Sequence, residues 1–551
     1  MTTQLDTGGQ TQRRIIWSVY YFTLVATGCN EWASWGQWVG FNWVAPLIVL
    51  LGLTGLTLTW LDNPWWHEHL NPIGLGTALF SVGVAGFGVI HGSNYFMTDS
   101  AAFNQRATSL FLKGINPYTA HFNPMHLDLS KAANFWTYTL NGGHIDQVSY
   151  PAGAFLLQAP VQWLGLTHLT SDYLDLVAWL ATGLVIYFAV TPKYRWIAPV
   201  LLVTSVFTYI FTHGGTDALF VPFLTLAAWR TTIFVDAQAT RWQRWIGPLA
   251  LGMACSIKQT PWFAAPLLLL VVLAAAPDID RSRWRVGTSY VVLALIPFTT
   301  LNLPFIFWNA KAWWHGTLIP LTQPLIPDGQ GLVSVVQHGL LTSITPNWLS
   351  VAGLGIFILL AVGVWSNPLR WSKAWLFALP LVLFVAARSL TAYYIDFLPA
   401  GIVAALSVRH VERSLTQSTL TLRVLRGFGA GLIAFGIILA FIPAHLSVQV
   451  NGYSVLSQGQ QIENLKLTFT NSSSQAIEPH VLVMVAGAHP VGFWTTKDPI
   501  VPAHSTVSLT YTSPNPVWIF TRGTNWIVEA TTTSPNAMIT SATQVWQWSP
   551  H

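Results

Sequence analysis

The feature that most constrains this chain is a series of apolar runs about as long as a bilayer is thick. A membrane-spanning helix needs about 20 mostly apolar residues. Of the 551 residues, 52% are hydrophobic and only 8% are charged, whereas about 25% of the residues in a soluble domain are charged. This composition excludes a soluble globular protein and predicts a polytopic α-helical protein that crosses the plasma membrane many times.

We expect about thirteen transmembrane helices from the positions of these runs. Their ranges are 15–33, 43–61, 72–91, 173–190, 197–213, 216–232, 245–257, 261–276, 288–305, 346–365, 374–391, 395–409 and 427–445. The apolar stretch 152–167 fits either a span or a surface helix, and we expect a surface helix because it gives the better charge distribution. The spans 245–257 and 261–276 are short and flank Lys258, so half-helices or tilted helices are expected there.

The distribution of basic residues orients these spans, because Lys and Arg concentrate in cytoplasmic loops. Most of the 25 Lys and Arg residues fall on the side of the N-terminus: Arg13, Arg14, Lys193, Arg195, Arg230, Arg241, Arg244, Arg281, Arg283, Arg285, Arg370, Lys373, Arg409, Arg413, Arg423 and Arg426. This predicts a cytoplasmic tail over 1–14, a transmembrane domain over 15–446 and an extracytoplasmic C-terminus.

The first long outer segment, 92–167, begins with Asp99 at the membrane surface. After Asp99, Phe103 and Leu110 share one helical face with Asn104 turned away, a pattern typical of an amphipathic helix lying at the interface. We therefore expect amphipathic helices in this segment. A second large outer loop is expected over 306–345.

The composition changes after about residue 446 to Ser, Thr, Asn, Pro and Val. Apolar and polar residues then alternate over 465–470, 480–485 and 506–511, and turn residues separate these short runs. Such alternation indicates strands with one buried face. We expect an all-β sandwich domain over 447–551 on the outer face of the membrane.

Ionisable side chains are candidates for functional residues because the chain has so few of them. Several fall on the expected outer side, at or next to the ends of apolar runs: Asp99, His213 with Asp217, Lys258 with Gln259, and Arg388 with Tyr393 and Tyr394. An ionisable group at membrane depth costs about 2.5–3.5 kcal/mol on insertion scales, so it needs a partner, a cavity or a function. A carboxylate that accepts a proton, next to cations that neutralise phosphate, suits group transfer from a phosphorylated lipid.

Taken singly, each of these residues could also have a purely structural role. Asp99 or Asp217 would cap a helix, and Lys258 would extend its ammonium to the interface from a helix end. Arg388 would anchor a lipid headgroup or pair with Asp396. The combination of these residues on one side of the membrane favours a functional role.

Other classes of site find no support in the sequence. The histidines lack the spacing of metal ligands, so no metal site is predicted. The two cysteines lie in or beside apolar runs, which indicates no disulfide framework. The chain has no nucleotide-binding glycine loop and its basic residues are scattered. Neither ATP hydrolysis nor binding to nucleic acid is expected.

The order of these elements resembles the GT-C superfamily of multi-spanning glycosyltransferases, which use polyprenyl-phosphate-linked sugars on the outer side of the membrane. The similarity covers roughly residues 72–410 and includes these pieces: Asp99 in the first outer loop, the turn 113–118, Tyr150-Pro151-Ala152-Gly153, the span entrance 215–220, the segment 256–262 around Lys258, Asn302-Leu303-Pro304-Phe305, and 327–332.

The resemblance implies a bacterial-type integral membrane hexosyl- or pentosyltransferase. Its acceptor would be a glycan, lipid or protein of the cell envelope. Asp99 would act on the acceptor as base or orienter, and Asp217 would assist it or hold a cation. Lys258, Gln259 and Arg388 would bind the phosphate of the donor.

The resemblance also implies side chains that contact the substrates. These are Tyr118, Tyr150, His315, Asp328, Tyr393 and Tyr394, with loop 306–345 closing over the sugar. No cofactor follows with certainty. Many members have a second acidic residue beside the first-loop aspartate, whereas Ser100 stands there in this chain, so a divalent cation is left open. The alternatives are a transporter or lipid flippase, and a non-catalytic envelope-assembly scaffold.

Overall fold

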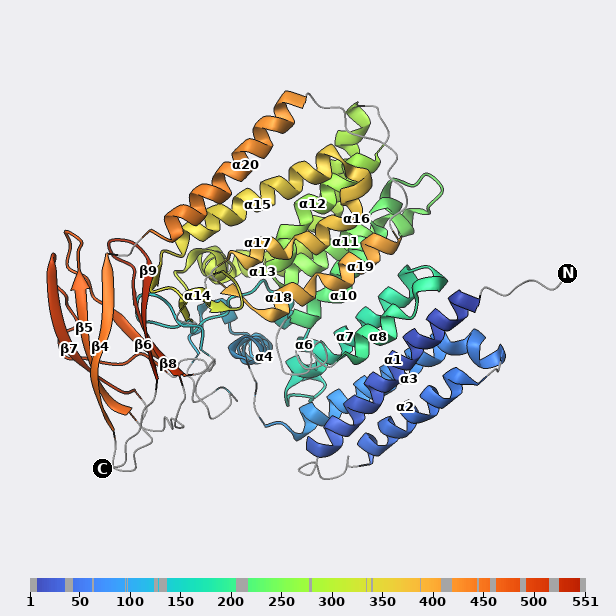
Figure 1. Cartoon of the computed structure of the whole chain (residues 1–551). Helices are drawn as coiled ribbons and strands as arrows, with labels where there is room; N and C mark the ends of the chain where they lie inside the picture. Colours follow the sequence, from blue (N-terminus) through green and yellow to red (C-terminus); the bar gives the residue numbers. More distant parts are fainter. Residues whose placement is uncertain are drawn as a thin grey trace.

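The chain is mostly helical, with β-structure at its C-terminal end (Figure 1). The computed structural model describes these residues: 7–34, 43–61, 64–94, 96, 98–122, 127, 136–204, 217–276, 280–332, 334–337, 340–386, 388–407, 419–442, 445–455, 462–485, 492–514 and 525–545. Within them, six helices are long and apolar enough to cross a membrane. The helical class with apolar spans is thus confirmed, whereas the total of about thirteen crossings expected from length is not.

The six candidate spans lie along the whole helical part of the chain. They are α3 (Pro64–Gly92), α7 (Thr170–Ala189), the segment Ala218–Val235 within α10 (Asp217–Arg230) and η5 (Thr232–Val235), Arg283–Thr322 of α13 (Asp280–Thr322), α15 (Asn347–Ser366) and Leu420–Ala440 of α20 (Thr419–Ala440). Further helices are α1 (Thr7–Ser34), α2 (Val44–Trp60), η4 (Pro192–Tyr194), α8 (Ile197–Val203), α11 (Arg241–Ile257), α12 (Thr260–Ala275), α16 (Pro368–Ala378), α17 (Pro380–Phe384), α18 (Thr391–Asp396) and α19 (Leu398–Ser407). Since α1 begins at Thr7, part of the expected tail 1–14 is helical.

Small residues let the helices of this bundle approach closely. A Cβ atom at Gly252 of α11 would overlap the backbone carbonyl of Ala294 in α13. A Cβ atom at Gly153 would lie 2.5 Å from the carbonyl oxygen of Ser256 near the end of α11. Close backbone approach at small residues is how helices associate in a membrane, where lipid and side chains are equally apolar.

Among its described residues, the segment expected as the amphipathic outer loop contains four short helices. They are α4 (Asp99–Leu112), η2 (Pro117–Thr119), α5 (Gly153–Leu156) and α6 (Ala159–Trp163). The side chain of Thr98 caps α4 by accepting a hydrogen bond from the backbone N–H of Ala101. The expected surface helix over 152–167 is therefore divided into α5 and α6.

One expectation about α4 is wrong: Asn104 is fully buried instead of facing water. Its side-chain amide donates a hydrogen bond to the backbone carbonyl of Ser100 (2.8 Å). The reason is tertiary, because α4 packs against α5, α6 and α7 and not only against the membrane surface. The apolar pattern of one helix does not show which other helices pack against its remaining faces.

The expected loop 306–345 is also helical over its first half. Helix α13 is interrupted at Asn309, whose φ of −161° and ψ of 94° are not helical, and then continues to Thr322. The side-chain oxygen of Asn309 accepts a hydrogen bond from the N–H of Ala312 (3.0 Å). It thereby caps a new helical stretch, which explains how the helix resumes directly after the interruption at Asn309. The remainder contains β1 (Asp328–Gly329), α14 (Ser334–Gln337) and β2 (Ser343–Ile344).

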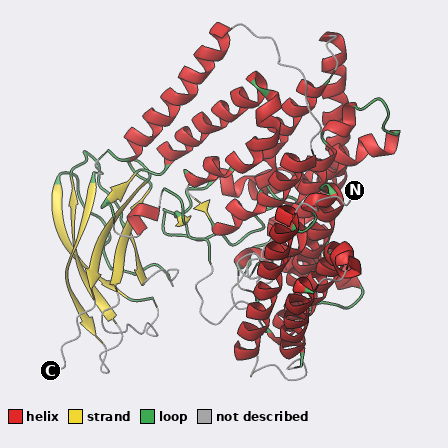
Figure 2. Cartoon of the chain, turned by 45° about the vertical axis from the view of Figure 1, so that its right-hand side comes forward, coloured by secondary structure: helices red, strands yellow, loops and turns green. Residues whose placement is uncertain are grey.

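The C-terminal β region consists of two antiparallel sheets packed face to face (Figure 2). One has the order β4-β5-β7, and the other β2-β9-β8-β6. The strands are β4 (Leu446–Val455), β5 (Ile462–Asn471), β6 (His480–Val485), β7 (Ser505–Thr512), β8 (Asn525–Thr532) and β9 (Met538–Val545). Leu465, Leu467 and Phe469 alternate along β5 and are completely buried with Trp526 of the opposite sheet. This confirms the β-structure expected from the alternating pattern.

The β region is joined to the helical part by a strand from the segment before α15. Strand β2 pairs with β9, where Ile344 lies opposite Ile539. Both isoleucines are completely buried in a cluster that includes Leu349 of α15 and Ala440 of α20. The side chain of Thr531 also donates a hydrogen bond to the backbone carbonyl of Leu140 (3.1 Å). The two parts therefore share one hydrophobic core at their junction.

Candidate active site

Several predicted residues lie together at one end of the helical bundle, called the α4 end below. Here α4 and α7 begin, α11 ends, α12 begins, and α18 lies close by (Figure 1). The side chain of Ser171 in α7 donates a hydrogen bond to the carbonyl of Ala101 in α4 (3.1 Å). These contacts bring the segment after α3 next to residues far along the sequence.

Asp99 is the first residue of α4, and its carboxylate is held by Thr137. The backbone N–H and the hydroxyl of Thr137 both donate to Oδ2, at 2.9 and 2.8 Å. Burial raises the pKa of the Asp99 carboxyl, while the nearby Arg388 guanidinium and the bonds from Thr137 act in the opposite direction. Asp99 therefore binds a proton more readily than an aspartate in water.

Tyr150 lies beside this carboxylate. Its phenol makes a side-chain hydrogen bond with Ser100 and is close enough to Tyr393 and Asp99 to feel their charge. Burial raises the pKa of the Tyr150 phenol, so it stays protonated at neutral pH. The hydroxyl of Tyr118 donates a hydrogen bond to the backbone carbonyl of Tyr150 (2.8 Å), which makes Tyr118 a support for the segment that carries Tyr150.

Lys258 follows the last residue of α11 with an extended backbone (φ −145°, ψ 156°). It is buried, with Nζ 4.8 Å from the ring centroid of Tyr393. The carboxylates of Asp396 and Asp175 attract its ammonium, and Arg388 is near enough to repel it. The structure thus brings both predicted cations, Lys258 and Arg388, into one electrostatic cluster.

Gln259 connects three segments at this site. Its amide nitrogen donates to the backbone carbonyls of Ser149 (2.8 Å) and Thr317 (2.5 Å). These bonds tie the start of α12 to the segment carrying Tyr150 and to the last part of α13. Gln259 therefore holds the cluster in place.

Arg388 is positioned by the segment expected as the second outer loop. Strand β1 runs parallel to β3 (Arg388–Ser389), so that Asp328 lies opposite Arg388. The N–H of Gln330 donates to the carbonyl of Ser389 (2.8 Å), and the Tyr394 hydroxyl is hydrogen-bonded to the hydroxyl of Ser389. The backbone of 328–330 thus lies against the site, as a loop closing over it would. The side chain of Asp328 lies outside the described residues.

Two other predicted residues are not placed in this cluster. His315 lines a separate cavity of about 770 Å³ formed along α13, with Lys311 and Trp314 among its walls. Asp217 begins α10, but its side chain and the preceding His213 lie outside the described residues.

Sequence reasoning missed two residues of the cluster and did not connect a third, Asp396, with Lys258. Thr137 lies in an irregular polar segment with no pattern to single it out. Asp175 sits one helical turn after Asp172 near the start of α7. Two aspartates at the entrance of an apolar run are costly there, so their presence was a usable indication. Asp396 was considered only as a partner of Arg388, whereas its charge acts on Lys258.

Within the described part of the chain, no three His, Cys, Asp or Glu side chains are placed to hold a metal ion. The cluster at the α4 end instead offers carboxylates, an ammonium, a guanidinium and phenols. No protein-family model, curated protein or solved structure matches this chain. The function is therefore inferred from the side chains gathered at the α4 end.

Proposed function

We propose that this protein is an integral membrane glycosyltransferase that moves a sugar from a polyprenyl-phosphate donor to a glycan, lipid or protein of the cell envelope. The observation that supports this most strongly is the convergence of Asp99, Arg388, Lys258 and Tyr150 at the α4 end. They come from four segments far apart in the sequence. The positive-inside distribution of Lys and Arg would put this end on the extracytoplasmic side.

The two cations suit a phosphate that leaves with negative charge. The bond between the anomeric carbon and the phosphate oxygen breaks, and the electron pair departs with the polyprenyl phosphate. Arg388 and Lys258 would stabilise that charge, since fixed cations in a site that excludes water act strongly on a developing anion. A guanidinium also matches two phosphate oxygens at once.

Asp99 suits the acceptor half of the reaction. Its carboxylate would take the proton of an acceptor hydroxyl, whose oxygen then bonds to the anomeric carbon. Thr137 donates both of its hydrogen bonds to Oδ2, so we assign the other oxygen, Oδ1, to the acceptor. Burial raises the pKa of Asp99, and a base works best when its pKa approaches the working pH.

The remaining predicted residues take supporting roles in this proposal. Tyr150 and Tyr393 would contact the sugar or its phosphate, because aromatic faces stack on sugar rings and phenols donate hydrogen bonds. Tyr118 and Gln259 position the segment carrying Tyr150. Tyr394, His315 and Asp328 would contact donor or acceptor, and Asp217 would assist Asp99 or hold a cation. The β region would recognise the acceptor.

A transporter is the second candidate, and one observation favours it. Asp396 is completely buried, and neither of its carboxylate oxygens has a hydrogen-bond partner among the described residues. Asp172 and Asp175 are buried in α7. Carboxyls inside a helical bundle mark ion and proton paths in membrane proteins. This reading assigns the same cluster to translocation instead of transfer.

One experiment separates the two candidates. Purified protein in proteoliposomes is given radiolabelled sugars on a panel of polyprenyl phosphates, together with mixed envelope acceptors. Wild-type protein should produce labelled acceptor, and Asp99→Asn should not. Sugar-lipid or proton movement across the vesicle without any labelled acceptor, in folded protein, would replace the transferase proposal with the transporter.

A further inference from the structure

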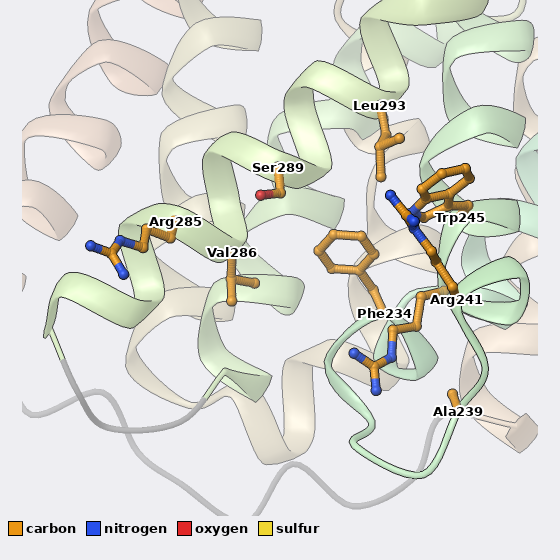
Figure 3. Close-up of a pocket in the computed structure, with 9 residues that line it drawn as sticks. Phe234, Ala239, Arg241, Trp245, Arg285, Val286, Ser289 and Leu293 are labelled. Atoms are coloured by element: carbon orange, nitrogen blue, oxygen red, sulfur yellow. The ribbon is translucent and has the colours of Figure 1, made fainter.

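A second group of basic residues lies at the other end of α11, away from Lys258. Helix α11 has 17 residues, so its two ends are about 25 Å apart at 1.5 Å per residue. At its N-terminal end is a cavity of about 660 Å³, lined by Arg241 and Arg244 of α11 and Arg285 of α13 (Figure 3). The cavity is thus well separated from the candidate active site.

The charge of this cavity is strongly positive. None of the lining residues that the structure describes is acidic. Arg241 stacks over the Trp245 ring at 4.5 Å, and Arg244 donates from Nη2 to the carbonyl of Ala237 (2.9 Å), so both guanidiniums are oriented. The Thr240 cap places the positive end of the α11 dipole at the same point. The Arg285 side chain points away from Arg241 on the far side of the cavity (Figure 3). An anion bound at the α11 end of the cavity would therefore be favoured chiefly by the guanidiniums of Arg241 and Arg244 and by the helix terminus.

The surroundings of the cavity place it at the level of a membrane interface. Trp242 and Trp284, next to the lining arginines in sequence, are 71% and 76% exposed. Exposed tryptophans collect where acyl chains meet headgroups. Most of the apolar surface of α13 is not covered by protein, and Val286 and Leu293 of that helix form the apolar part of the wall.

We propose that this cavity binds the phosphodiester headgroup of an anionic phospholipid, with its acyl chains along α13. Arginine forks match phosphate oxygens bidentately, and basic pockets between transmembrane helices on the cytoplasmic side suit anionic headgroups. The apolar wall explains why the ligand is a lipid instead of free phosphate. This inference does not depend on the proposed transferase activity.

Native mass spectrometry of the delipidated full chain in detergent tests the proposal. The probes are dioleoyl phosphatidylglycerol and dioleoyl phosphatidylcholine. The test variant carries Arg241→Gln, Arg244→Gln and Arg285→Gln. The control carries three changes that remove the same charge from exposed arginines of the described chain outside this cavity: Arg370→Gln, Arg423→Gln and Arg426→Gln.

Wild-type and control proteins should bind phosphatidylglycerol at least about tenfold more tightly than phosphatidylcholine, a ratio equal to about 1.4 kcal/mol. The test variant should lose that preference, and millimolar inorganic phosphate should not displace the lipid. Unchanged phosphatidylglycerol affinity in the test variant would overturn the proposal, as would displacement by inorganic phosphate. If thermal denaturation shows that the triple variant does not fold, Arg244→Gln alone must weaken phosphatidylglycerol binding several-fold for the proposal to stand.

Discussion

Replacing Asp99 by Asn tests the proposed chemistry most directly, because it removes a basic oxygen at almost constant volume. The oxygen of Asn can still accept the two bonds that Thr137 donates at 2.9 and 2.8 Å. The substitution also removes the cost of burying a carboxylate charge, which is what raises the pKa of Asp99. We therefore expect an unfolding temperature equal to that of the wild type or slightly higher.

The expected loss of activity follows from the role of a general base. Such a group contributes about 10²- to 10⁴-fold to the rate, or about 2.7–5.4 kcal/mol at 1.36 kcal/mol per factor of ten. The loss should appear in kcat, because the substitution leaves Arg388 and Lys258, the proposed ligands of the donor phosphate, in place. The KM for the polyprenyl-phosphate sugar should change little.

The assay is transfer of radiolabelled sugar by purified protein, with Asp146→Asn as the matched control. Asp146 lies in the same segment between α3 and α7, and its Oδ2 is 2.7 Å from Nδ1 of the exposed His121. Its replacement removes the same charge away from the cluster, and its rate should stay within about twofold of wild type, since an exposed ion pair contributes about 0–1 kcal/mol. A wild-type rate in Asp99→Asn, or an equal loss in both variants, would refute the assignment of Asp99.

The other predictions concern a cation of this cluster and the residues that bond to it or pack beside it. Lys258→Met should raise the KM for the donor and lower stability by about 3–5 kcal/mol, because it leaves buried carboxylates without their cation; a donor KM equal to wild type would remove the phosphate-binding role. Thr137→Val should raise the pKa of Asp99 further, because a donor to the charged form is lost. The rate falls as pH drops through that pKa, so the acid limb of the pH–rate profile should move to higher pH, and an unmoved limb would contradict the base. Gly153→Ala should cost about 1–3 kcal/mol of stability, because its Cβ would approach a carbonyl oxygen of α11 to 2.5 Å, whereas Gly76→Ala, which meets nothing within 4 Å, serves as the neutral control in thermal unfolding.

The parts of the fold that the sequence predicted depend on local patterns. Apolar runs placed the helices on either side of Lys258, with α11 ending at Ile257 and α12 beginning at Thr260. Alternation placed β5 and β7. Both predictions worked because the periodicity of burial belongs to one element at a time. The helix in 306–322 was missed because Asn309, Lys311, His315 and Pro320 interrupt the apolar run there, whereas the local cap at Asn309 restarts the helix.

The sequence likewise revealed some residues of the candidate site and not others. Its charged members were visible in the sequence, because Asp99, Lys258 and Arg388 are costly residues in an apolar chain. Their partners were not visible, since Thr137 approaches Asp99 only through the packing of an irregular segment. The burial of Asn104 likewise depends on three neighbouring helices.

The sequence by itself therefore determined the helical class with its candidate membrane spans, the positions of many helices and strands, and the charged side chains of the candidate site. The tertiary structure alone decided which of those side chains meet. It brought Asp396 close enough to Lys258 for their charges to interact, placed β1 beside Arg388, and joined β2 to the C-terminal sheet. The physical reason is that apolar and polar periodicity is a property of neighbouring residues, whereas a charged cluster or a sheet edge is completed by residues hundreds of positions away.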